Sequence, residues 1–132
     1  MSRETFEAIE GQQAHFGYAQ AVRVGETIWI AGTPGCDEAL KFPEDMAGQL
    51  RQVYENLATT LAHFGGTLRD LVDLTVFVSD IGEYTTAAAQ VRGEYFGHEG
   101  LPASALVQVS GFLLPQVRVL IKAVAVVGSS SG

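Results

Sequence analysis

A helical repeat of apolar residues in the middle of the chain limits the choice of fold most strongly. The stripe steps by three or four residues and consists of Met46, Leu50, Val53, Leu57, Leu61 and Phe64. This spacing predicts an amphipathic helix of about five turns. Asp45 is a suitable N-cap, and Gly65 and Gly66 provide a left-handed stop. Because such a helix must bury its stripe, the strand-like segments around it predict a sheet as the second layer.

Short alternating segments on both sides of this helix predict strands. Residues 21–24 and 27–31 flank Gly25 and Glu26, which predicts a two-residue hairpin with a type II′ turn, because glycine accepts the positive φ at its first position. Residues 71–78 alternate in the same way. Their apolar face consists of Val72, Leu74, Val76 and Val78. Residues 1–14 are mostly polar and predict an edge strand or a draped terminus.

A second helix is predicted after residues 71–78. Asp80 and Glu83 have the spacing of a capping box, with aspartate in place of the usual serine or threonine. The stripe that follows consists of Tyr84, Ala88, Val91 and Tyr95. Phe96 and Gly97 are expected to end this helix.

The last third of the chain contains two longer alternating segments, residues 101–109 and 117–125. The predicted core positions are Ala103, Ala105, Val107, Val109, Val117, Val119, Ile121 and Ala123. The opposite positions are Ser104, Leu106 and Gln108 on the first segment and Arg118, Leu120 and Lys122 on the second. If the two strands are neighbours, Ser104 and Lys122 approach each other across one surface.

The order strand, strand, helix, strand, helix, strand, strand predicts an α+β fold, a mixed sheet with two helices on one face. We expect residues 1–127 to form a single domain and the Ser/Gly residues 128–132 to form a flexible tail. Phe77, Leu106 and Leu120 make the other face too apolar for water alone. Self-association into a closed cyclic oligomer is the simplest way to cover it.

Composition argues against several classes of function. The 132 residues carry a formal net charge of −7, which opposes binding to a nucleic-acid backbone. No apolar run is long enough for a membrane span, and the start of the chain lacks the features of a secretory signal, so a cytoplasmic protein is expected. Cys36 is the single cysteine, so we expect neither an internal disulfide nor a cysteine metal cluster.

The polar residues form no familiar catalytic motif. His15, His63 and His98 are far apart and lack metal-ligand spacing, so no metal is expected. Lys122 stands inside a predicted strand, where it either extends to solvent, binds a carboxylate in a cavity or, if desolvated, acts as an amine base. Tyr18 precedes the first hairpin strand and either packs on such a cavity with its hydroxyl exposed or is an ordinary half-buried tyrosine.

Several short segments occur in a fixed order from about residue 17 to residue 127. They are residues 17–25, 30–33, 70–72, 75–80 and 95–97, the residues Gln49, Asn56, Leu57, Leu61 and Gly65, and the pair Pro102 and Ala103. Together they resemble the RidA/YjgF/YER057c/UK114 family. The resemblance implies a chorismate-mutase-like fold assembled as a homotrimer, with the sheets forming a central barrel and three ligand clefts between subunits. It also implies hydrolysis of reactive enamines and imines to 2-oxo acids and ammonia, without a cofactor.

The resemblance also assigns roles to particular positions. An arginine after Pro-Ala binds the substrate carboxylate, and a glutamate in the last strand positions the attacking water; these positions are Ser104 and Lys122 here. An earlier glutamate corresponds to Leu120, and an asparagine of the second helix to Ala88. Serine has neither the charge nor the fork of arginine, so the chain is most similar to the family branch that lacks this arginine.

Two hypotheses follow. In the first, a RidA-like homotrimer binds a small carboxylate-bearing metabolite in an intersubunit cleft and, if it is an enzyme, carries out hydrolytic deamination of an enamine or imine or a related hydrolysis. Lys122 and Ser104 are then the candidate catalytic residues. The candidate ligand-binding residues are Tyr18, Ala31, Gly32, Thr33 and Leu106. In the second, the trimer binds its ligand without turnover and has a regulatory role. The net charge disfavours the endoribonuclease activity attached to some relatives.

Overall fold

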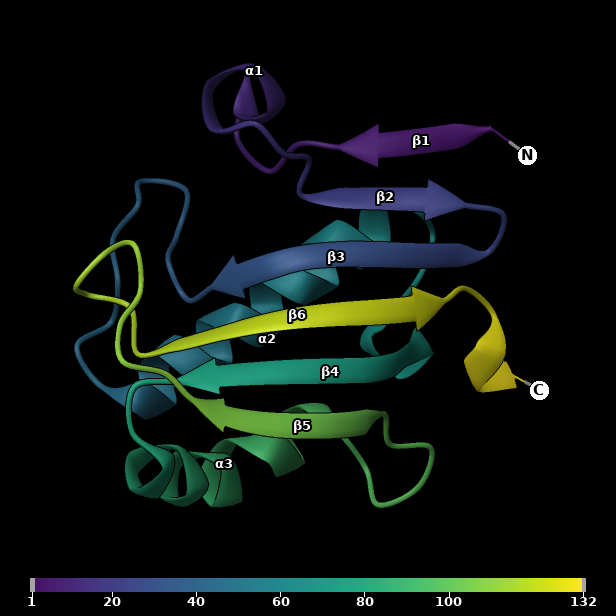
Figure 1. Ribbon diagram of the computed structural model, residues 1–132. Coiled ribbons are helices and arrows are strands. Elements are labelled where there is room, and N and C mark those ends of the chain that lie inside the picture. The colour runs from purple at the N-terminus through teal and green to yellow at the C-terminus, as the bar shows by residue number, and fades with distance from the viewer. Residues whose placement is uncertain (1, 132) are drawn as a thin grey trace.

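Residues 2–131 are described by a computed structural model, in which one mixed sheet is covered on one face by two long helices (Figure 1). The strands are β1 (Arg3–Phe6), β2 (Ala21–Val24), β3 (Thr27–Pro34), β4 (Leu71–Val78), β5 (Ala103–Gln108) and β6 (Val119–Val126). The helices are α1 (Gln12–Phe16), α2 (Met46–His63) and α3 (Ile81–Tyr95), with 3-10 turns η1 (Leu68–Asp70) and η2 (Ser129–Ser131). The strand order is β1-β2-β3-β6-β4-β5, which confirms the predicted α+β fold.

Helix α2 forms where the apolar stripe predicted it. The Asp45 side chain accepts a hydrogen bond from the Gly48 amide, which satisfies one of the free N–H groups of the first turn. Gly65 follows the helix with a φ of 79°, the left-handed conformation expected for its C-terminal stop. All six stripe residues are buried against the sheet. At about 1.5 to 3 kcal/mol for each large side chain, this burial is the main reason that the helix is stable.

Helix α3 begins at its predicted cap, where Asp80 accepts from the Glu83 amide. The second half of the predicted capping box is absent, because the Glu83 carboxylate instead pairs with Arg118 at 3.0 Å. Tyr84, Ala88 and Val91 are buried as expected. The helix connects β4 to β5, and these two strands are the parallel pair of the sheet. Parallel neighbours need such a crossover, so α3 lies beside the β5 edge (Figure 1).

The N-terminal half contains the predicted hairpin and edge strand. Gly25 has a φ of 61°, and Glu26 is not among the positive-φ residues, which is the combination of a type II′ turn. Strand β1 pairs with β2 at the edge of the sheet, so the expectation of an edge strand is confirmed. The five-residue helix α1 was not predicted; it lies between glycines at 11 and 17 that both have positive φ.

Strand β4 departs from the predicted alternation at its first residues. The pairing with β6 shifts between Leu71 and Asp73, which indicates a bulge. Leu71 is therefore buried and Val72 is exposed, so the prediction that Val72 shares the core face is wrong. From Leu74 onward the alternation is as predicted.

The C-terminal strands differ most from the sequence-based expectation. They are not neighbours, because β4 lies between β5 and β6. Register also corrects the core face of β5: Ala103, Ala105 and Val107 pair with residues on the helix-free face of β4. Ser104 and Leu106 pair with Leu74 and Val76, which point toward the helices. The buried face of β6 was predicted correctly and contains Val119, Ile121 and Ala123.

One buried amide joins α2 to the segments that flank it. The Nε2 of Gln49 donates to the carbonyl oxygens of Pro43 and Gln116, both at 2.9 Å, and its Oε1 accepts from the Arg118 amide at 2.9 Å. Gly35 lies against the same turn, where an added Cβ would stand 2.9 Å from the Gln49 Cα. The chain after β3 and the chain before β6 therefore meet α2 at Gln49.

The helix-free face of the sheet is the open face of the chain. Trp29 is 45% exposed there, and Phe77 and Leu120 are half-buried cross-strand partners. Leu106 was expected on this face but lies on the helix side, because it pairs with Val76. A partly apolar open face thus exists, and Val107, the partner of Phe77, takes the place there that was predicted for Leu106.

The last residues contact the start of β4. The carboxylate of the buried Asp70 accepts hydrogen bonds from the Gly128 amide and the Ser130 hydroxyl, and the Ser129 hydroxyl donates to the Asp70 carbonyl oxygen. The boundary at residue 127 and the flexibility of the Ser/Gly tail stay predictions.

Candidate active-site groove

A groove between α3 and β5 is the main candidate site. Strand β5 is the edge of the sheet and pairs with β4 alone, so α3 covers only part of its helix-facing side. The space left between them has a volume of about 520 Å³. It is lined by Val76, Tyr84, Thr85, Ala88, Ala89, Arg92, Gly93, Phe96, Gly97, His98, Leu101, Ser104 and Leu106. This volume is within the range of about 300 to 1,000 Å³ that small-molecule sites occupy.

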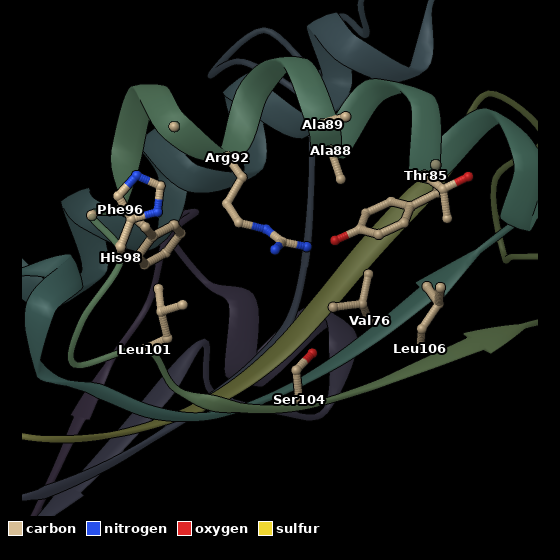
Figure 2. Close-up of a pocket in the computed structure, with 13 residues that line it drawn as sticks. Val76, Thr85, Ala88, Ala89, Arg92, Phe96, His98, Leu101, Ser104 and Leu106 are labelled. Carbon is tan, nitrogen blue, oxygen red and sulfur yellow. The ribbon is translucent and has the colours of Figure 1, made fainter.

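Strands β4 and β5, helix α3 and the loop between α3 and β5 make the walls of the groove. Ser104 and Leu106 project from β5, and Val76 comes from the neighbouring strand β4 (Figure 2). Helix α3 provides Ala88 and Arg92 from successive turns, because residues four apart share one face of a helix. Figure 2 shows the Arg92 side chain extending from α3 into the space above β5, and the Ser104 hydroxyl pointing into the same space.

The groove is cationic although the chain as a whole is acidic. Among the described residues, its lining contains Arg92 and His98 and no aspartate or glutamate. The net charge of −7 is therefore carried by residues elsewhere. A local cationic patch between apolar walls attracts small anions and disfavours cations.

Two tyrosine hydroxyls are held in the neutral form, that of Tyr84 in the groove lining and that of its neighbour Tyr54. Burial raises the pKa of Tyr84, against the opposing effects of a side-chain hydrogen bond with Tyr54 and of the nearby charge of Arg92. Burial is also the main cause that raises the pKa of Tyr54. Tyr84 therefore remains an uncharged hydrogen-bonding group at neutral pH, and it adds no negative charge that would repel an anion.

The structure separates the two candidate catalytic residues. Ser104 lies in the groove, on the helix side of β5. Lys122 is exposed on the open face, where it is the register partner of Thr75. The expectation that they approach each other across one surface is therefore wrong within a single chain, because β4 intervenes and the side chains project to opposite faces.

The candidate ligand-binding residues also divide into groups. Leu106 lines the groove beside Ser104. Ala31, Gly32 and Thr33 lie on β3, which β6 and β4 separate from β5. The Thr33 hydroxyl is buried; it donates to the Ala31 carbonyl oxygen at 2.9 Å and accepts from Gln20 at 3.1 Å. Tyr18 is half exposed, in the segment between α1 and β2.

Arg92 is the charged groove residue that the sequence analysis did not identify, and Thr85, Phe96 and Leu101 in the lining were also not predicted. The signal for Arg92 was its place one turn after Ala88, a position that the resemblance had already marked in the second helix.

Cys36 gains no role from the structure: burial is the main cause that raises the pKa of its thiol, so it is protonated at neutral pH. In the part of the chain that the structure describes, no group of three or more His, Cys, Asp or Glu side chains could hold a metal ion. Nor is any helix within residues 2–131 long and apolar enough to cross a bilayer.

Comparison with known proteins agrees with this fold. The family model described as Endoribonuclease L-PSP matches residues 9–127. The 2-iminobutanoate/2-iminopropanoate deaminase of Escherichia coli is 32% identical over 122 residues, which are 90% of this chain and 94% of that protein. The chain belongs to the RidA/YjgF family. A RutC family protein of Pyrococcus abyssi is 36% identical to this RidA/YjgF chain over 97 residues, 70% of the chain and 73% of the relative.

Solved structures of the family have the same architecture. Rv2704 from Mycobacterium tuberculosis, a member of the YjgF/YER057c/UK114 family, superposes on this RidA/YjgF chain with a TM-score of 0.82 at 29% identity, covering 96% of the chain and all of that protein. The structure of protein YJGH gives a TM-score of 0.83 at 27% identity, with 96% and 98% covered. The family named in the sequence analysis is therefore confirmed.

Proposed function

We propose that the groove between α3 and β5 binds a small carboxylate-bearing metabolite, and that the reaction carried out there is hydrolytic deamination of an enamine or imine. The observation that carries this proposal is the cationic lining without a carboxylate in an acidic chain. The names of relatives as deaminases at about this level of similarity support the reaction class. In that reaction water adds to the C=N carbon, the tetrahedral carbon then expels ammonia, and a 2-oxo acid remains.

The proposal includes assembly as a homotrimer without nucleic-acid or membrane partners, in the cytoplasm, and without a cofactor. Copies of the chain would cover the open face, on which Trp29 is 45% exposed. A cleft between copies would place the β5 edge of one beside β3 and the open face of the next. Only in such a cleft could Ser104 and Lys122 act on one ligand, because β4 separates them within a chain.

A second candidate function, ligand binding without turnover, is favoured by one observation. Within residues 2–131 no aspartate or glutamate lines the groove, so these residues offer no carboxylate there to position or activate the attacking water. Arg92 and His98 can hold an anion, but at neutral pH a guanidinium cannot accept a proton. The assay below separates the two candidates.

We expect the protein to accelerate hydrolysis of 2-iminopropanoate. The imine is generated in place by an amino acid oxidase, and hydrolysis is followed as a loss of semicarbazone in competition with semicarbazide. Ser104→Trp should abolish the acceleration, because the indole fills the groove, whereas Arg3→Ala on the opposite sheet edge should leave it unchanged. No acceleration over buffer would reject the deaminase and leave the binding function.

A further inference from the structure

Arg92 is the arginine that lines the groove. Arg23, Arg51 and Arg118 each form an ion pair with a glutamate, at 3.3, 2.8 and 3.0 Å. Among the residues that the structure describes, Arg3, Arg69 and Arg92 have no ion-pair partner. Of these three, Arg92 lines the groove, and its side chain extends over it (Figure 2). Its charge is therefore available to a ligand that enters the groove.

The surroundings of Arg92 favour an anion with an apolar body. Phe96, Leu101 and Leu106 contribute apolar walls, against which the carbon body of an anion can pack. The planar guanidinium presents paired N–H donors that match the two oxygens of a carboxylate. The Ser104 hydroxyl, on the opposite wall, can donate a further hydrogen bond to the ligand (Figure 2).

The groove also has room for more than a methyl group beside the carboxylate. Ala88 and Ser104 are small side chains on facing walls, and the volume of about 520 Å³ exceeds what a three-carbon acid fills. A larger apolar substituent could bury its surface against Leu101 and Leu106. Each methylene so buried contributes to affinity.

We propose that Arg92 is the carboxylate anchor of this groove, and that the ligand is a 2-oxo or 2-imino acid with an apolar side chain of several carbons. The inference rests on the proposed function, because it assigns the carboxylate site and the substrate class of the same groove. It places the anchoring cation on α3 instead of at position 104 of β5.

The test is isothermal titration calorimetry of the full chain with 4-methyl-2-oxopentanoate, its neutral amide and pyruvate. We expect 4-methyl-2-oxopentanoate to bind about 10-fold more tightly than pyruvate, because of its additional apolar carbons. Arg92→Ala should weaken binding of the acid by about 10-fold to 100-fold, the effect of losing charge-assisted hydrogen bonds. The same substitution should leave the affinity for the amide within about 3-fold, because the amide carries no charge for Arg92 to bind.

Two controls separate the anchor from a change in fold or net charge. Arg92→Lys should recover part of the affinity, since the charge remains but the fork is lost. Arg3→Ala makes the same charge change at the other sheet edge and should have no effect. If Arg92→Ala bound the acid as well as the wild type, or if pyruvate bound as tightly as the longer acid, this inference would fail while the proposed function stood. If the wild type bound no acid, both would fail.

Discussion

Replacing Gln49 by leucine is expected to lower the free energy of unfolding by about 3 kcal/mol. Leucine has a similar size but neither donates to the carbonyl oxygens of Pro43 and Gln116 nor accepts from the Arg118 amide, which leaves three backbone groups without their partner. Each unsatisfied buried group costs about 1 to 3 kcal/mol, and these three are only part-buried, so the lower end of the range applies. The loss is a large fraction of the stability of a domain of this size.

Urea denaturation followed by circular dichroism measures this effect, and Gln52→Leu is the matched control. Gln52 lies about one turn after Gln49 on α2. Its side-chain amide donates one hydrogen bond, to the Asn56 side-chain oxygen at 2.9 Å. Its replacement should cost less than about 1 kcal/mol. Equal stability of the two variants would show that Gln49 does not hold the segments together.

Gly35→Ala is expected to have a comparable or larger effect, a loss of about 3 kcal/mol or more. The added methyl would stand 2.9 Å from the Gln49 Cα and closer still to its carbonyl oxygen. Both atoms belong to the backbone of α2, so no rotamer change relieves the overlap and the helix itself must move. Overpacking of this kind costs about 1 to 3 kcal/mol where side chains can adjust, and more where they cannot.

The control for this substitution is Gly93→Ala on α3. An added Cβ at Gly93 has no heavy atom within 4 Å, and the residue is inside a helix. Alanine there should raise stability by about 0.5 to 1 kcal/mol, so the two variants are predicted to have opposite signs. A stable Gly35→Ala protein would mean that the chain after β3 does not need to approach α2 so closely.

Much of the fold follows from the sequence, because caps, stripes and turns are local signals. The Asp45 and Asp80 caps, the buried stripe of α2 and the type II′ turn at Gly25 all occur where the pattern predicts them. Strand β5 was misassigned for a physical reason. Its residues alternate between two sets that are both partly apolar, so the pattern does not say which set faces the helices.

The position of β5 had a signal of another kind. A strand, a helix and a strand in succession favour a parallel crossover unit, so β5 should lie beside β4. If β5 and β6 both pair with β4, they lie on opposite sides of it, which would have placed Ser104 away from Lys122. The bulge at the start of β4 had no such signal, since neither leucine at position 71 nor valine at position 72 is a residue that indicates a bulge.

The site was predicted only in part. Ser104 and Leu106 were identified from the family resemblance and do line the groove. Arg92 was not predicted because it is not at a position to which the resemblance assigns a catalytic or binding role. Lys122 was predicted to replace the missing arginine as the cation of the site. Its place on the open face depends on the strand order, which is difficult to predict from a single sequence.

The central claim is that the groove between α3 and β5 is the ligand site, and a nuclear magnetic resonance titration tests it most directly. Labelled protein is titrated with 2-oxobutanoate, and backbone amide shifts are mapped onto the fold. We predict saturable shifts that are largest at Ala88, Ser104 and Leu106, which line the groove. Shifts confined to Trp29 and Lys122 on the open face, or no saturable shift at all, would contradict the account.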